Sequence, residues 1–86
     1  MENNKLEEKL NIYEGERVII NILGFLQSQY TIENLKYNIE YEILNIEDEE
    51  TDNYIKINLN QIYKIDEEAS QIKLYLDNDI IIILSI

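Results

Sequence analysis

The segment Lys36–Ile43 alternates strictly between polar and apolar residues, and this pattern constrains the fold more than any other in the chain. Successive side chains of a β-strand point to opposite faces, so the alternation predicts a strand with one buried face and one exposed face. The residues expected on the buried face are Tyr37, Ile39, Tyr41 and Ile43. Both tyrosines are therefore predicted to lie in the core.

Four further segments are rich in β-branched or aromatic residues, which favour an extended backbone. They are Arg17–Leu23, Tyr54–Leu59, Gln71–Leu76 and Ile80–Ile86. Asp77-Asn78-Asp79 separates the last two segments and tolerates the positive φ of a tight loop, so a hairpin is expected there. Residues 27–35 are polar and weakly patterned, which predicts a loop.

Two irregularities follow the alternating segment. Leu44 and Ile46 have the opposite parity to the apolar residues before them, which predicts a β-bulge that bends the strand. The run Glu47–Asn53 is acidic and lacks apolar residues, so it is predicted to form the turn to the next strand. A second acidic turn is expected at Asp66–Ser70.

The N-terminal segment has a different period. Leu6, Leu10 and Tyr13 are spaced at i, i+4 and i+7, which predicts a short amphipathic helix. Asn4 is its expected N-cap, and Gly15 is its expected end. Such a short helix is only marginally stable alone, so its apolar face is expected to pack on the strands.

Together these segments predict one α+β domain, mainly β, over residues 1–86: a helix within 1–14 and about five antiparallel strands within 16–86. So short a chain buries long strands only by curling them, so we expect a bent sheet or small barrel with the helix over an open end. This order of elements resembles that of the small Sm-like and SH3-like barrels. The resemblance implies a self-associating structural or adaptor module as one possible function.

The composition makes several kinds of chemistry improbable. The chain has no His and no Cys, so it lacks an imidazole base, a thiol nucleophile and the usual zinc ligands. Asp48, Glu50 and Asp52 are spaced like the start of an EF-hand loop, but Asn53 and Leu59 stand where that loop needs Gly and Glu. We therefore expect no enzymatic activity, no cofactor and no metal site.

The charge balance also restricts the partners. The chain has 18 Asp and Glu against 7 Lys and Arg, a formal net charge of −11. No segment is net positive, so neither direct nucleic-acid binding nor attachment to an anionic membrane is expected. The chain also lacks a signal peptide and an apolar run long enough to span a bilayer, so a cytoplasmic protein is expected.

The negative charge is concentrated, because residues 36–53 contain seven acids and one lysine, a net −6 of the total −11. The candidate partner-binding residues are these acids and the tyrosine after them: Glu40, Glu42, Glu47, Asp48, Glu49, Glu50, Asp52 and Tyr54. Residues two apart on a strand are separated by about 6.8 Å, roughly twice the ~3.4 Å step between phosphates of one DNA strand. We therefore expect this surface to block a basic nucleic-acid-binding groove on a partner protein. The alternative is a solvated face that only keeps the chain soluble.

The 18 Ile and 11 Asn are residues of AT-rich codons, which predicts that the chain comes from a low-GC bacterium or from a phage or plasmid living in one. In size, acidity and expected source it resembles the small anti-CRISPR and other anti-defence proteins. The resemblance implies a non-catalytic inhibitor in the bacterial host cell. An immunity protein or antitoxin that neutralises a basic toxin would use the same physics. A homodimer is a further possibility if Ile80–Ile86 is an edge strand.

Overall fold

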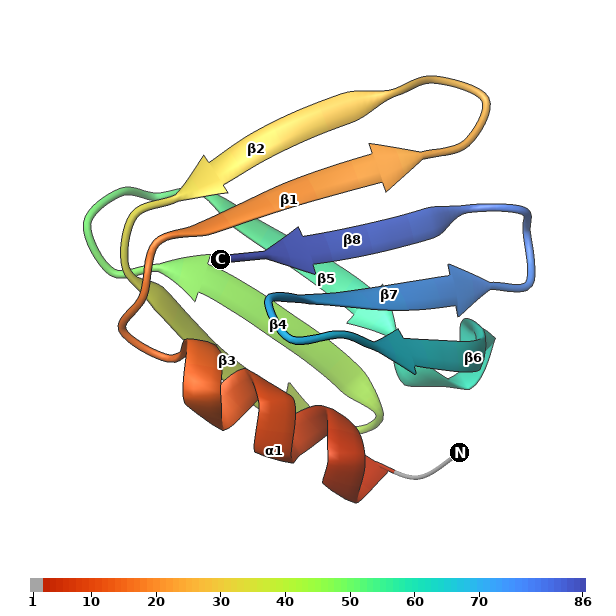
Figure 1. The fold of residues 1–86 in the computed structure, drawn as a ribbon, viewed down its shortest axis with the longest axis horizontal. Helices are drawn as coiled ribbons and strands as arrows, with labels where there is room; N and C mark the ends of the chain where they lie inside the picture. Colours follow the sequence, from red (N-terminus) through yellow and green to blue (C-terminus); the bar gives the residue numbers. More distant parts are fainter. Residues whose placement is uncertain (1–2) are drawn as a thin grey trace.

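The computed structural model describes residues 3–86, with side chains from Leu6 onward, as one helix and eight strands (Figure 1). The helix is α1 (Asn3–Tyr13), and a 3-10 helix, η1 (Leu59–Gln61), lies between the fifth and sixth strands. The strands are β1 (Val18–Leu23), β2 (Ser28–Ile32), β3 (Leu35–Glu40), β4 (Ile43–Asp48), β5 (Tyr54–Asn58), β6 (Ile62–Glu67), β7 (Gln71–Leu76) and β8 (Ile81–Ser85). The predicted class, mainly β with one N-terminal helix, is confirmed, but the number of strands was underestimated.

The strands form two antiparallel sheets that face each other across the core. The larger sheet has the order β2-β1-β8-β7-β6, and the smaller has the order β3-β4-β5. The chain passes from one sheet to the other at the corner between β2 and β3 and returns through η1 (Figure 1). Among the described residues no strand pairing joins the two sheets, so the strands form a two-layer sandwich rather than a closed barrel.

The change of parity after the alternating segment arises from a tight turn and not from a bulge. Tyr41 and Glu42 have φ angles of 51° and 63° and form the two-residue loop between β3 and β4. Positive φ at both central residues is the hallmark of a type I′ hairpin turn. The single strand expected over Lys36–Ile43 is therefore wrong. Tyr41, expected in the core, is 96% exposed, whereas Tyr37 packs against the core as expected.

The positive φ of Tyr41 leads to a first prediction, because residues other than Gly, Asn and Asp rarely adopt this backbone conformation. We expect Tyr41→Asn to stabilise the protein by about 0.5–1 kcal/mol, since Asn favours this turn and the exposed tyrosine ring makes no core contact. The measurement is the urea midpoint of unfolding. Tyr63→Asn is the control, because Tyr63 is also exposed but lies in β6, outside a tight turn. An equal gain in both variants would show that the backbone of the turn is not the cause.

β2 occupies residues where we expected a loop. Five residue pairs join it in register to β1, from Val18–Ile32 to Ile22–Ser28. As an edge strand it has solvent on one side, so a mostly polar sequence is compatible with this position. The loop between β1 and β2 carries Phe25, which is 100% exposed, so this side chain is not part of the core.

β8 lies in the middle of the larger sheet and pairs with β1 on one side and β7 on the other. The predicted hairpin between β7 and β8 is confirmed, and Asp79 in its turn has a φ of 64°. The homodimer expected if Ile80–Ile86 were an edge strand cannot form by edge pairing, because both edges of β8 are occupied.

The N-terminal helix packs as the sequence predicted. Leu6, Leu10 and Tyr13 are each 0% exposed and belong to the core. Gly15 follows the helix with a φ of 82°, as its expected end requires. The expected N-cap at Asn4 falls on a side chain outside the described part of the structure.

Hydrogen bonds hold α1 across one open side of the sandwich. The hydroxyl of Tyr37 on β3 donates to Oδ1 of Asn11 at 2.6 Å. Nζ of Lys9 donates to the backbone oxygen of Glu68, beyond the end of β6, at 2.6 Å. β3 and β6 are edge strands of different sheets, so the helix closes the side of the sandwich on which they lie (Figure 1).

A second prediction concerns the hydroxyl of Tyr13, for which no described residue is a hydrogen-bond partner although the atom is buried. Burial raises the pKa of Tyr13, and the charge of Glu67 raises it further. We expect Tyr13→Phe to raise the free energy of unfolding by about 1 kcal/mol, because it removes a buried polar group that lacks a partner.

Tyr37→Phe is the matched control, because it removes the hydroxyl that donates to Asn11 and is expected to cost about 1 kcal/mol. Urea unfolding measures both variants. A loss of stability in Tyr13→Phe as large as in the control would contradict the prediction.

Candidate interaction site

The acidic segment after β4 is anchored by Asp48, whose side chain accepts three backbone hydrogen bonds. Its Oδ2 accepts from the N–H of Glu33 at 3.0 Å, and its Oδ1 accepts from the N–H groups of Asn34 and Glu50 at 3.1 and 3.0 Å. These bonds, from Glu33 first and Glu50 next, hold the pKa of Asp48 below its ordinary value. Asp48, one of the residues expected to contact a partner, is only 4% exposed, so its side chain offers a partner little surface. It fixes the acidic segment to the corner between β2 and β3.

The other acids of this segment point to solvent. The exposed residues Glu47, Glu49, Glu50 and Asp52 are called the acidic turn below. Nζ of Lys36 lies 3.9 Å from Oε1 of Glu49, and both side chains are about half exposed. Such a surface ion pair contributes little to stability, and this one lysine offsets only one of the four carboxylates of the acidic turn.

The outer face of the smaller sheet is not the row of acids expected from the sequence. Strand register places these outward residues in three rows: Lys36, Glu47 and Tyr54; Asn38, Asn45 and Lys56; Glu40, Ile43 and Asn58. Two lysines and two glutamates leave this face without net charge. Glu42 lies in the β3–β4 turn, where its Oε2 accepts from Nδ2 of Asn60 at 2.6 Å. Glu40 and Glu42 thus lie at the opposite end of the hairpin from the acidic turn, and the strand spacing that would match phosphates is absent.

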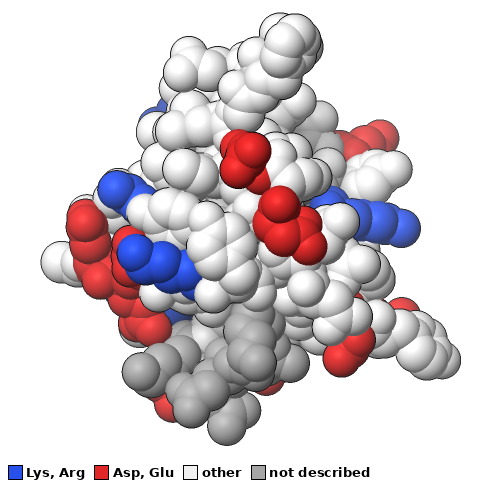
Figure 2. Space-filling view, turned by 90° about the vertical axis from the view of Figure 1, so that its right-hand side faces the viewer, with Lys and Arg blue, Asp and Glu red and all other residues white. Residues whose placement is uncertain are grey.

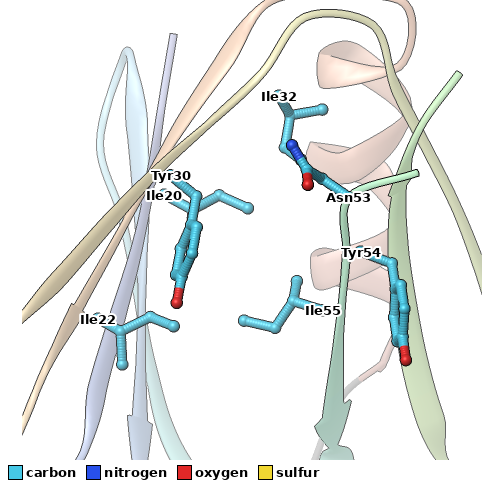
Figure 3. A pocket seen from close by; sticks show the side chains of 7 residues that line it. All are labelled: Ile20, Ile22, Tyr30, Ile32, Asn53, Tyr54 and Ile55. Carbon is cyan, nitrogen blue, oxygen red and sulfur yellow. The ribbon is translucent and has the colours of Figure 1, made fainter. Parts of the chain in front are cut away.

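An apolar groove opens on the side of the sandwich opposite α1. It lies between the β1–β2 pair of the larger sheet and β5 of the smaller sheet and has a volume of about 180 Å³. β2 and β5 are the edge strands there. Figure 3 shows Ile20, Ile22 and Tyr30 projecting from the larger sheet towards Ile55 of the smaller sheet. Ile22, Tyr30 and Ile55 therefore remain partly exposed along this side, whereas Ile20 and Ile32 at the base of the groove are buried.

The groove and the acidic turn adjoin each other. Asn53 and Tyr54 line the groove and also a second, polar hollow of about 250 Å³ that includes Glu47, Thr51 and Asp52. The ring of Tyr54 points away from the groove (Figure 3) and is 67% exposed on the outer face. Nζ of Lys56 lies 6.0 Å from the centre of this ring. The structure thus combines an apolar hollow with a negatively charged rim.

The end of the molecule with the β1–β2 and β7–β8 turns carries charges of both signs (Figure 2). Figure 2 shows the end of the molecule with the β1–β2 and β7–β8 turns, where acidic and basic side chains are scattered among uncharged residues. An uncharged projection stands at the top of this view, where Figure 1 places the β1–β2 loop. That loop carries Phe25 and Leu26, which are 100% and 74% exposed.

Within residues 3–86 no three Asp or Glu side chains are grouped so that they could hold a metal ion. Over the same residues, none of the helices is both long and apolar enough to cross a membrane. Comparisons with protein-family models, with curated proteins and with solved structures gave no match to this chain. The site must therefore be interpreted from its own geometry.

Sequence patterns predicted a turn over Glu47–Asn53, of which Glu47 and Asp48 belong to β4, and they missed the groove. The extended backbone expected over Tyr54–Leu59 is confirmed for Tyr54–Asn58, where Ile57 belongs to the core and Ile55 packs against it. Tyr30 fell in the segment expected to be a loop, so its place opposite Ile55 was not foreseen. A groove between two edge strands depends on how the sheets stack, and no spacing within one strand encodes that.

Proposed function

We propose that the chain is a non-catalytic binding protein of a low-GC bacterial host cytoplasm whose acidic turn occupies a basic, nucleic-acid-binding groove of a partner protein. The observation that carries this proposal is the anchoring of four exposed carboxylates beside Asp48, in a stretch (47–53) without a single cation. Anchored charges lose less conformational entropy on binding than charges on a free loop. In an anti-defence inhibitor, this arrangement would exclude nucleic acid from a nuclease.

Electrostatic attraction would govern such binding. Oppositely charged surfaces accelerate association, and the effect weakens as salt screens exposed charges. The proposal therefore requires that complex formation weakens with ionic strength and that nucleic acid competes for the same partner surface. The alternative of a self-associating adaptor relied on the C-terminal strand as a free edge, and β8 is paired on both sides.

The test compares two variants of equal charge. The turn variant is Glu49→Gln, Glu50→Gln and Asp52→Asn; the control variant is Glu8→Gln, Glu68→Gln and Asp77→Asn. Each replaces three exposed acids and changes the formal charge from −11 to −8. The wild-type chain and the two variants are immobilised separately, and each is exposed to a lysate of a low-GC bacterium. We expect the wild type and the control to retain a nucleic-acid-binding protein that added DNA or RNA releases, and the turn variant to retain at least tenfold less.

Equal retention of that protein by both variants would show that bulk charge, and not the acidic turn, causes binding. Retention that added nucleic acid leaves unchanged would contradict occupation of a nucleic-acid groove.

A further inference from the structure

The side of the sandwich opposite α1 is left open by the fold. α1 covers the side where β3 and β6 lie, with three fully buried residues. On the other side Ile22, Tyr30 and Ile55 remain partly or largely accessible, although they lie on the inner faces of the sheets. Leaving apolar surface open to water costs about 25 cal/mol per Å², so a ligand that covers it gains that free energy.

We propose that the groove receives one apolar side chain, of the size of Phe or Leu, from a Lys- or Arg-rich segment of the partner protein. This inference rests on the proposed function, because the same partner supplies the positive charges that contact the acidic turn. The groove would thus add an apolar contact to the electrostatic one, and the chain would select basic segments that carry an apolar side chain.

The size of the groove fits such an anchor. Its volume is about 180 Å³, and isoleucines from both sheets line it. A cavity of about 150 Å³ lined by Leu, Ile and Phe is large enough to bind benzene. A phenyl ring or a branched aliphatic side chain therefore fits between Ile22 and Ile55, whereas a whole helix does not.

Charge complementarity decides what carries this side chain. Asn53 and Tyr54 join the groove directly to the hollow lined by Glu47 and Asp52. A segment that places an apolar side chain in the groove must bring its neighbouring residues beside these acids. A second copy of the chain, with its charge of −11, would be repelled there, and so would an anionic lipid surface. Lys or Arg next to the anchor are favoured for the same reason.

The experiment uses two synthetic, end-capped pentapeptides of equal charge, Lys-Lys-Phe-Lys-Lys and Lys-Lys-Ala-Lys-Lys. Their affinities are measured by isothermal titration calorimetry at low salt for the wild type, the turn variant and Ile55→Trp, which fills the groove. We expect the wild type to bind the Phe peptide about tenfold tighter than the Ala peptide, because burial of the ring contributes a transfer free energy of this order. Ile55→Trp should bind both peptides equally, with the affinity of the wild type for the Ala peptide.

The two proposals fail in different ways. Equal binding of the two peptides by the wild type overturns the groove proposal, whether or not Ile55→Trp folds, and leaves the acidic turn unaffected. If the turn variant binds the Ala peptide as tightly as the wild type does, the acidic turn has no role in binding. Sedimentation shows whether the free chain is a monomer. Phe25 is a fully exposed apolar side chain and could enter the groove of a second copy. A dimer that Phe25→Ser abolishes would therefore overturn the proposal, because a second copy and not a partner protein would occupy the groove.

Discussion

Ile46→Ala is expected to lower the free energy of unfolding by about 3 kcal/mol, whereas Ile55→Ala lowers it by about 1 kcal/mol. The two isoleucines are cross-strand neighbours on β4 and β5 and point to the same face of the smaller sheet. Ile46 is 0% exposed, so its truncation leaves a cavity in the core as well as removing buried methyl groups. Ile55 lines the open groove, where solvent fills the space left by truncation. The difference therefore measures how far the sandwich is open along β5.

Urea unfolding followed by circular dichroism provides both values, provided that the dependence on urea concentration has the same slope in both variants. A loss in Ile55→Ala as large as in Ile46→Ala would show that the sheets close over this position in solution. The groove would then not exist in the free protein, and an anchor could not enter without a conformational change.

Asp48→Asn is expected to lower Tm by roughly 5–10 °C at pH 7, because it weakens the anchoring of the corner between β2 and β3. Three backbone N–H groups point at the carboxylate, and the asparagine amide nitrogen would instead direct its hydrogens at one or more of them. The effect is also expected to depend on pH. The lowered pKa of Asp48 means that its contribution to stability is complete above the unfolded-state pKa of about 3.9. That contribution is lost as pH falls through the still lower pKa of the folded state.

The difference in Tm between the wild type and Asp48→Asn should therefore shrink as the pH decreases from about 5 to below 3. Protonation of the other acids changes the Tm of both proteins alike, so it cancels in this difference. Glu47→Gln is the control, because Glu47 is next to Asp48 in the sequence but its side chain is exposed. This substitution should change Tm by no more than about 2 °C. A difference for Asp48→Asn that stays constant between pH 7 and pH 2.5 would contradict the role given to the carboxylate.

The sequence pattern predicted those elements in which the spacing of apolar residues or the turn residues match the burial and backbone of the structure. Leu6, Leu10 and Tyr13 have helical spacing and are buried, and the hairpin at Asp77-Asn78-Asp79 has residues typical of tight turns. Tyr41-Glu42 was missed because these residue types do not normally adopt positive φ. The alternation that continued through this turn therefore suggested one strand in place of two.

Asp48 shows why the candidate site was only partly predictable. In the sequence it is one of five acids within six residues and has no distinguishing neighbour. Its role depends on the N–H groups of Glu33 and Asn34, which a hairpin brings to it from 15 and 14 residues away, respectively. Likewise, the groove exists because β2 and β5, edges of different sheets, lie on the side that the helix does not cover. Both features are consequences of tertiary structure.

The most direct test of a joint site formed by groove and acidic turn is a methyl and amide NMR titration of the wild-type chain with the Phe pentapeptide. We predict that the methyl resonances of Ile20, Ile22 and Ile55 shift together with the amides of residues 49–52, and that both sets of shifts saturate at one dissociation constant. The methyls of Ile19 and Ile83, on the outer face of the larger sheet, should remain unchanged. Shifts confined to the amides, or spread equally over both faces, would contradict a site in which the acidic turn and the groove act together.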